Sequence, residues 1–236
     1  MDRAAYIAMN AASEALRAQS ITAHNIANAG PSGFKALLTH TEAANVEGPG
    51  WHSRVNGVLK PETWNAQGGA LQSTGRDLDI ALADDRWLAV QTEDGGIAYT
   101  RNGALQMTAN GQVLDGEGRP VLTEDGPMAL PPHSELMIAA DGTISLTPQG
   151  SEASVRAQVG RLSVIEAAPS ELKRRADGLF EPLPGADTRP AAGAVMVSGM
   201  LEASNVNAAE QLVALIEHSR RFELATKAMK TADSHG

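Results

Sequence analysis

The C-terminal part of the chain, from Ser198 to Ser234, repeats positions at alternating intervals of four and three residues, most of them apolar. The repeat runs through Leu201, Asn205, Ala208, Leu212, Leu215, Ser219, Phe222, Thr226 and Met229, and Val206, Val213 and Ile216 widen the apolar face. This is the spacing of a heptad seam, which needs a partner helix. With Ser204 as N-cap, the pattern predicts a helix from about Asn205 to Asp233. Periodicity alone fits packing within one domain and assembly between chains equally well.

The N-terminal part of the chain has a similar alternation from Arg3 to Asn28. It runs through Ala5, Met9, Ala12, Leu16, Gln19, Ala23 and Ile26. Many of the other residues are alanines, which favour helix and allow close helix approach. Gly30 can take the left-handed position after the last turn and Pro31 cannot continue a helix, so the helix is expected to end here. The two terminal helices can pair with each other, with neighbouring copies, or with both.

Between these ends the period of the pattern changes to two. From Leu71 onward short alternating runs are separated by Gly-containing turn dipeptides such as Asn102-Gly103 and Asp141-Gly142. Such runs predict many short strands in an antiparallel sheet or a barrel-like domain. The predicted fold class is therefore α+β, with long N- and C-terminal helices pairing as a coiled-coil stalk and a central, mostly antiparallel β domain. The expected divisions are a helix in residues 1–35, an extended connector in 36–75, the β domain in 76–197 and a helix in 198–236.

The composition narrows the class of protein without naming a function. Of the 236 residues, 42% are hydrophobic but only 3% are aromatic, so the core is expected to be aliphatic. The formal net charge of −9 argues against binding to nucleic acid or to an anionic membrane surface. No apolar run is long enough to cross a bilayer, so no membrane insertion is expected. The sequence has no cysteine, which excludes disulfides and thiolate chemistry.

No group of residues has the pattern of an active site. The densest acidic cluster contains Asp77, Asp79, Asp84 and Asp85, but it lacks a calcium-loop pattern. Strand alternation predicts that Asp77 and Asp79 face outward, so a solvated turn or edge explains them better than chemistry. The six histidines are scattered without metal-ligand spacing. We therefore expect no catalytic, cofactor-binding or metal site, and no enzyme activity.

Both ends and the centre of the chain resemble one protein family. The first helix runs into Asn25-Ile26-Ala27-Asn28 and then Gly33-Phe34-Lys35, and the C-terminal end carries Leu201-Glu202-x-Ser204-Asn205-Val206 and Arg221-Phe222-Glu223. Residues 73–122 are similar to a shared β segment. These three signatures, in this order, resemble the rod, hook and hook-associated axial proteins of the bacterial flagellum. The opening Met-Asp-x-Ala-x-Tyr-x-Ala-Met is most similar to the proximal-rod member of that family.

The resemblance implies a structural subunit that polymerises through its terminal helices into the rod of the flagellar basal body. The implied partners are other rod subunits, further copies of itself, and the flagellar type III export apparatus. Its implied location is the periplasmic rod, reached without a cleaved signal peptide; the first residues show no such signal. In such an assembly the helices line the inner wall and the β domain forms the outer layer.

The residues expected at the assembly interface come from both ends of the chain. The apolar members are Met9, Leu16, Ile26, Leu201, Val206, Leu212, Leu215, Ile216, Phe222 and Met229. Asn25, Asn28, Gly33, Phe34 and Lys35 are expected to fix how the first helix continues into the extended segment, and Asn205 belongs to the C-terminal signature.

Two other interpretations remain open at this stage. Within the family, a distal-rod or hook subunit resembles the chain in the same places. Outside it, a carbohydrate-binding or hydrolytic β domain on a helical oligomerisation stalk fits the same pattern of elements. A soluble coiled-coil regulator is disfavoured because the middle of the chain is a large β domain.

Overall fold

A computed structural model describes residues 2–39, 41–45, 55–59, 63–152 and 155–234 of the chain. The chain divides into two compact units. The helical unit comprises residues 1–29, 35–65 and 206–236, and the β unit comprises residues 30–34 and 66–205. The predicted α+β class is confirmed, and each unit is described by itself.

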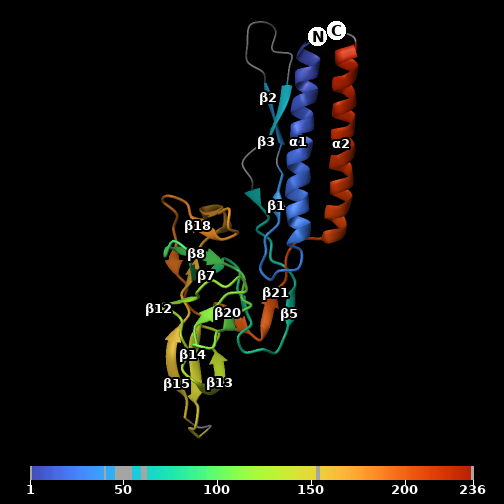
Figure 1. Ribbon diagram of the computed structural model, residues 1–236. Helices are drawn as coiled ribbons and strands as arrows, with labels where there is room; N and C mark the ends of the chain where they lie inside the picture. Colours follow the sequence, from blue (N-terminus) through green and yellow to red (C-terminus); the bar gives the residue numbers. More distant parts are fainter. Residues whose placement is uncertain (1, 40, 46–54, 60–62, 153–154, 235–236) are drawn as a thin grey trace. The chain divides into compact units, whose positions relative to one another are not determined.

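The helical unit is built on two long helices, α1 (Asp2–Ala27) and α2 (Ala208–Ser234). They lie side by side and antiparallel, with the start of α1 beside the end of α2 (Figure 1). Two short ladders complete the unit, β1 (Leu37–Leu38) with β4 (Thr63–Trp64) and β2 (Thr41–Asn45) with β3 (Val55–Leu59). Strand β3 lies beside α1. Neither helix is apolar enough over a sufficient length to span a membrane in the part of the chain described.

The helix boundaries agree with the sequence prediction for α1 and differ for α2. Helix α1 begins and ends one residue before the predicted limits. Gly30 does not have a positive φ, however, so its predicted left-handed position is wrong; the left-handed glycine of this segment is Gly33, at φ +70°. Helix α2 begins at Ala208 rather than near Asn205.

The N-cap of α2 is Asn207 and not Ser204. The Asn207 Oδ1 accepts hydrogen bonds from the backbone N–H groups of Ala209 and Glu210 at 3.1 and 3.4 Å. These are two of the donors that a helix leaves unpaired in its first turn, which is why asparagine is favoured at this position. The residues before it, including Leu201, belong to an extended segment.

The largest sheet of the β unit has six strands in the order β17-β18-β8-β7-β16-β19. Its strands are β7 (Arg86–Gln91), β8 (Ile97–Thr100), β16 (Val164–Glu166), β17 (Leu172–Arg174), β18 (Phe180–Pro182) and β19 (Arg189–Pro190). A three-stranded sheet follows the order β13 (His133–Ile138), β14 (Thr143–Pro148) and β15 (Ala157–Arg161). The hairpin predicted around Asp141-Gly142 is the turn between β13 and β14.

Four two-stranded ladders complete the β unit, together with a short 3-10 helix, η1 (Pro169–Glu171). They pair β5 (Leu71–Ser73) with β21 (Met200–Glu202), β6 (Ile80–Leu82) with β20 (Met196–Ser198), β9 (Gln106–Met107) with β10 (Val113–Leu114), and β11 (Leu122–Thr123) with β12 (Gly126–Pro127). Each of these pairs is antiparallel, as are those of the two larger sheets. The prediction of a mostly antiparallel β body is confirmed.

The core of the β unit is aliphatic, as the low aromatic content predicts. Its most buried members include Ile80, Leu88, Val90, Leu105 and Val121, each with no exposed surface. One aromatic pair lies in the same unit: the rings of Trp87 and Phe180 are 4.7 Å apart between centroids. The Trp87 indole N–H donates to the Ala167 carbonyl at 3.0 Å, so its polar edge is satisfied where it is buried.

Candidate functional site

The surface by which α1 packs inside the helical unit is made largely of small residues. Ala8, Ala12, Ala15 and Ala18 are buried, and Ala225 is the buried alanine of α2. Small side chains let two helix axes approach closely. Met9 and Leu16, the larger apolar residues of the predicted seam, are therefore not needed for this contact, although Ile21 of α1 is buried.

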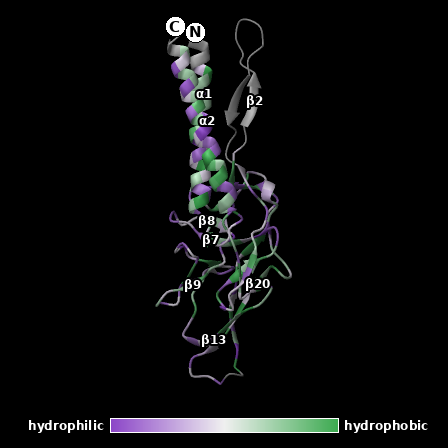
Figure 2. Ribbon diagram, turned by 90° about the vertical axis from the view of Figure 1, so that its right-hand side faces the viewer, coloured by the Kyte–Doolittle hydropathy of each residue, from purple (hydrophilic) through white to green (hydrophobic). Residues whose placement is uncertain are grey.

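The larger apolar residues of the predicted seams divide into an exposed and a half-buried group. Met9 and Leu16 of α1 are 46% and 49% exposed, and Leu212 and Ile216 of α2 are 51% and 57% exposed. The half-buried group comprises Ile26, Val206, Leu215, Phe222 and Met229. Figure 2 shows hydrophobic and hydrophilic residues alternating along both helices. Part of the apolar surface is therefore covered within the chain, and part remains open to solvent.

The register of the α1 seam differs from the sequence prediction. The predicted positions Met9, Leu16 and Ala23 are exposed, whereas Ala8, Ala15 and Thr22, one residue earlier, are buried. The prediction chose the larger apolar side chains, but alanine permits the closer approach and so decides which face packs inward. The α1 seam prediction is therefore wrong as an intrachain contact for Met9, Leu16 and Ala23, whereas its member Ala12 is buried.

Asn25 fixes the return of the chain after α1. Its side chain is 2% exposed and exchanges two hydrogen bonds of 2.8 Å with the backbone of Leu37: Nδ2 donates to the carbonyl and Oδ1 accepts from the N–H. Nδ2 also lies 3.3 Å from Oε1 of Gln211 on α2. One amide thus joins α1, the start of β1 and α2, because it supplies a donor and an acceptor in the manner of a peptide group.

The other residues of this signature have separate surroundings. Asn28 donates from Nδ2 to the His24 carbonyl at 2.8 Å, and Lys35 is 2% exposed within the helical unit. In the β unit, the guanidinium carbon of Arg174 lies 5.1 Å from the centre of the Phe34 ring.

Gly33 occupies a position that only glycine fits. Its φ is +70°, and a Cβ would lie 2.2 Å from the backbone carbonyl oxygen of Arg101. Its N–H donates to the Glu202 carbonyl at 2.7 Å. Glycine is required at position 33 because its backbone lies against the backbone of Arg101 and Glu202.

Leu201 and Asn205 lie in the extended segment before α2 and not on a helical seam. Leu201 is in β21 and pairs with Gln72 of β5. Asn205 donates from its backbone N–H to the Phe34 carbonyl at 3.2 Å and from Nδ2 to the Gln67 carbonyl at 2.8 Å. The seam prediction is wrong for these two residues because the helix begins after them.

The sequence analysis missed a buried ion pair between Arg101 and Glu202. Their side chains are 6% and 2% exposed, and the Arg101 Nε donates to the Glu202 Oε2 at 2.7 Å. The Glu202 Oε1 accepts the Gly69 N–H at 3.0 Å, so the carboxylate joins three separate chain segments. An acidic residue beside Leu201 in a two-faced strand was the available signal, because alternation turns one of the two inward.

Arg101 also forms hydrogen bonds and a ring contact besides its ion pair with Glu202. Its guanidinium donates to the carbonyls of Leu82, Ala83 and Arg86 at 2.9 to 3.0 Å. It also lies 5.6 Å from the centre of the Trp87 ring. These contacts hold a buried charge where an unpaired one would be very costly.

The net charge of the chain is confined to the β unit. The helical unit carries nine Lys and Arg residues and nine Asp and Glu residues, whereas the β unit carries 10 and 19. The whole formal charge of −9 therefore belongs to the β unit. The exposed apolar residues Met9, Leu16, Leu212 and Ile216 lie on the unit without net charge.

The acidic cluster divides into three exposed residues, Asp77, Asp84 and Asp85, and one buried residue, Asp79. Asp79 is 3% exposed and pairs with Arg76, whose Nε lies 3.0 Å from Oδ1, so its predicted outward position is wrong. It lies directly before β6 and forms an isolated antiparallel bridge with Ala104. Within the described part of the chain, no three His, Cys, Asp or Glu side chains are placed to hold a metal ion.

Three family models match successive parts of the chain. A model described as "Flagella basal body rod protein" matches residues 6–35, "Flagellar hook protein FlgE/F/G D1 domain" matches residues 81–146, and "Flagellar basal body rod FlgEFG protein C-terminal" matches residues 197–235. The first and third contain the two terminal signatures, and the second lies in the β unit.

Relatives match over almost their full length. The flagellar basal-body rod protein FlgF of Escherichia coli (strain K12) is 42% identical over 243 positions, covering 100% of this chain and 96% of the relative. FlgF of Salmonella typhimurium is 40% identical with the same coverage. The flagellar basal-body rod protein FlgG of Buchnera aphidicola subsp. Schizaphis graminum is 29% identical, over 91% of this chain and 89% of the relative.

The order of the three signatures, the terminal helices and the full-length identity agree with one another. The resemblance proposed from the sequence is therefore confirmed, and the hydrolytic or carbohydrate-binding alternative is not supported. The chain belongs to the family of flagellar basal-body rod proteins, whose members are structural proteins and not enzymes.

Proposed function

We propose that the chain assembles with further copies of itself and with other rod subunits into the proximal rod, through α1 and α2. The observation that carries this is the exposure of large apolar side chains on both helices, at Met9, Leu16, Leu212 and Ile216. Fully burying such a side chain stabilises by about 1.5–3 kcal/mol, so half of that remains available at each position. Four such positions supply several kcal/mol per contact between subunits.

The helices present this surface as an antiparallel pair, which we interpret as a short coiled coil. Along α2, the positions Gln211, Leu215, His218, Phe222 and Ala225 are buried or half-buried and alternate by four and three. That is the spacing of knobs-into-holes packing. The rod core domain that we propose comprises residues 1–35 and 198–236, of which 30–34 and 198–205 lie in the β unit. Residues 36–75 are its proposed connector and 76–197 the proposed β domain.

Polymerisation requires contacts between different surfaces of neighbouring copies. Head-to-tail contacts that do not close generate a helical filament, whereas self-complementary contacts stop at a dimer. As a rod subunit of the periplasmic basal body, the chain is exported by the flagellar type III apparatus without a cleaved signal peptide. This part of the proposal is supported by the family resemblance and not by a feature of the described structure.

The proximal position is supported by the opening signature and by the identities. Identity is 42% and 40% to two FlgF proteins and 29% to a FlgG protein. We expect the chain to restore motility in a bacterium that lacks its FlgF protein and not in one that lacks its FlgG protein. Restoration of only the second strain would favour the distal-rod or hook alternative.

The assembly surface is tested by charge insertion into the full-length chain. We expect the double variant Leu16→Glu, Leu212→Glu to abolish self-association and co-assembly with other rod subunits in sedimentation velocity. The matched control is Ile97→Glu, Val197→Glu, since these residues are 61% and 51% exposed but lie in the β unit. Circular dichroism establishes that each variant is folded. Equal assembly of both variants, or loss in both, would contradict the proposal.

A further inference from the structure

Three segments of the β unit carry every connection of the chain to the helical unit. They are residues 30–34, 66–70 and 199–205, and each borders the helical unit in the sequence. The first follows α1, and the third leads to α2. We call them the exit segments. Whatever holds them in the β unit also holds the points from which both helices continue.

Glu202 bonds to both of the other exit segments. Its carbonyl accepts the Gly33 N–H at 2.7 Å, and its Oε1 accepts the Gly69 N–H at 3.0 Å. Its Oε2 accepts the Arg101 Nε–H at 2.7 Å. One residue therefore links the three exit segments to one another and to an arginine that belongs to none of them.

Further hydrogen bonds join the same three segments. The Asn205 N–H donates to the Phe34 carbonyl at 3.2 Å, and the Asn205 Nδ2 donates to the Gln67 carbonyl at 2.8 Å. The Ala203 N–H donates to the Ala70 carbonyl at 2.9 Å. Phe34 and Asn205 are the last residues of their segments within the β unit. The exit segments are thus bonded to one another up to the points at which they leave this unit.

Arg101 connects these segments to the interior of the β unit. It is buried, and its guanidinium donates to the carbonyls of Leu82, Ala83 and Arg86, at the end of β6 and the start of β7. A displacement of Glu202 would separate two buried charges, which is strongly unfavourable. The ion pair therefore opposes rearrangement of the exit segments more than their backbone hydrogen bonds alone would.

We propose that Arg101 is a positioning residue for assembly, acting through Glu202 to keep the exit segments ordered in the single subunit. The proposal rests on the assembly function above, in which α1 and α2 carry the contacts between subunits. If the helices continued from loose segments, those segments would lose conformational freedom on association, and that loss opposes binding. Segments that are already ordered do not lose it.

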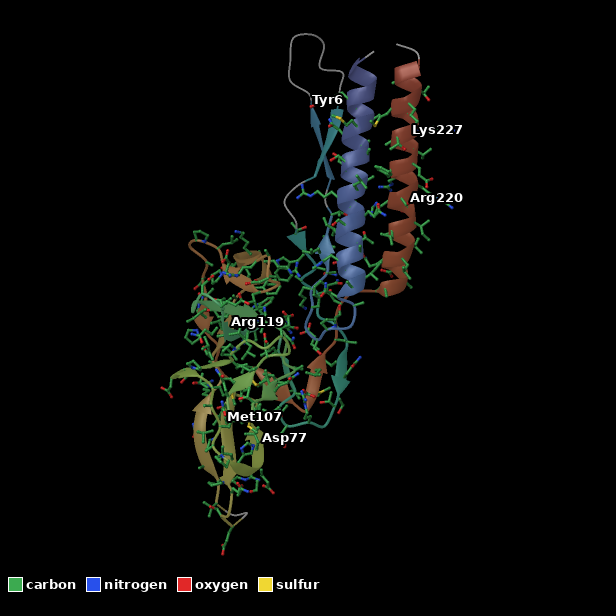
Figure 3. The ribbon with its side chains drawn as sticks, viewed as in Figure 1. Tyr6, Asp77, Met107, Arg119, Arg220 and Lys227 are labelled. Atoms are coloured by element: carbon green, nitrogen blue, oxygen red, sulfur yellow. The ribbon has the colours of Figure 1, made fainter. Side chains whose placement is uncertain are left out.

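A second buried carboxylate of the β unit provides a matched control. Asp115 is 1% exposed, and its Oδ2 accepts the Arg119 Nε–H at 2.8 Å. Figure 3 labels Arg119 in the β unit. The Asp115 Oδ1 accepts the backbone N–H groups of Glu117 and Arg119, so the side-chain bonds of Asp115 to described residues stay within residues 115–119. Loss of this charge disrupts a buried ion pair without touching an exit segment.

The test compares Glu202→Gln with Asp115→Asn in the full-length chain. Each exchanges a buried carboxylate for an amide of nearly equal size, and each should lower Tm. Self-association is measured by sedimentation equilibrium at a temperature at which circular dichroism shows both variants folded. We expect Glu202→Gln to weaken it about tenfold and Asp115→Asn less than about twofold. Equal weakening by the two variants would overturn the proposal, because a loss of stability would then explain both.

Asn205→Ala is a milder variant that keeps the buried ion pair. It removes the Nδ2 bond to the Gln67 carbonyl and therefore loosens two exit segments with little effect on the core. We expect self-association to weaken about threefold. If Glu202→Gln does not fold, this variant decides, and association equal to that of the natural chain overturns the proposal.

Hydrogen exchange in the dilute, monomeric chain measures the order of the exit segments directly. In Glu202→Gln we expect faster exchange in peptides from all three segments and unchanged exchange in β14. Asp115→Asn should leave the exit segments as they are in the natural chain. Faster exchange confined to residues 199–205 would contradict a linkage of the three segments.

The outcomes separate this proposal from the assembly function. If Leu16→Glu, Leu212→Glu abolishes association but Glu202→Gln associates like Asp115→Asn, the positioning role is wrong and the assembly surface stands. If Leu16→Glu, Leu212→Glu leaves association unchanged, the proposed assembly surface is wrong.

Discussion

Replacing Glu202 by glutamine tests whether the buried ion pair holds the β unit together. Glutamine has nearly the same size, and it can still accept the Gly69 N–H that Glu202 Oε1 accepts at 3.0 Å. It cannot balance the Arg101 guanidinium, which is 6% exposed and remains bound to three backbone carbonyls. The substitution therefore leaves a buried charge without its counter-charge.

The expected cost follows from that burial. Removing one partner of a buried pair typically costs about 3–5 kcal/mol. In a unit of this size, each kcal/mol lowers Tm by about 2–4 °C, so the expected decrease is roughly 6–20 °C. Replacing both partners, as in Arg101→Met with Glu202→Gln, should cost less than the two single losses together because no buried charge remains.

Near-ultraviolet circular dichroism is a suitable assay, since Trp87 lies 5.6 Å from the Arg101 guanidinium. The control is Glu117→Gln, which removes a carboxylate that pairs with Arg119 at 2.8 Å but is 57% exposed. An exposed pair contributes about 0–1 kcal/mol, so its Tm should hardly change. A Glu202→Gln decrease no larger than that of the control would refute the reasoning.

Two further predictions concern the helical unit. Asn25→Ala removes the side chain that hydrogen-bonds both the N–H and the carbonyl of buried Leu37. We expect the free energy of unfolding to decrease by about 2–4 kcal/mol, measured by thermal unfolding in far-ultraviolet circular dichroism. A decrease of less than about 1 kcal/mol would contradict a stabilising role of these two hydrogen bonds. The pKa of His218 is lowered from 6.5 by desolvation and then by Arg221, against an opposing effect of Glu217. The unfolded chain thus takes up this proton first, so stability is present above pH 6.5 and falls as pH drops through that value. The His218→Gln variant should lose less of its free energy of unfolding than the natural chain between about pH 7.5 and 5.5. An unchanged pH dependence of stability would refute the role of His218.

The sequence predicted the elements of the fold better than their contacts. The heptad patterns and turn dipeptides are local signals, and they located both helices and the hairpin at Asp141-Gly142. The aliphatic core followed from the low aromatic content. The heptad pattern could not indicate which face of α1 packs inward, because that choice depends on the partner. With alanines at positions 8, 12, 15 and 18, close approach selects the small face and leaves Met9 and Leu16 outside.

The residues that the sequence analysis missed act through distant partners. Arg101 and Glu202 are 101 positions apart, and the strand alternation at Glu202 gives no indication that Arg101 is its partner. Asn205 was placed on the seam by its spacing, but its position before the cap excludes it. Asn25 and Gly33 both lie in the region that the rod-protein model matches. Asn25 bonds the backbone of Leu37, whereas Gly33 allows two backbone segments to pass closely.

The separation of charge between the units bears on how an acidic chain can polymerise. With −9 on every copy, association of whole chains is opposed by repulsion. The helical unit contributes nothing to that repulsion, because its nine basic and nine acidic residues cancel. At physiological salt, repulsion between β units decays over about 8 Å, so it acts only where those units come close. Apolar contacts on a neutral unit can therefore set the strength of association.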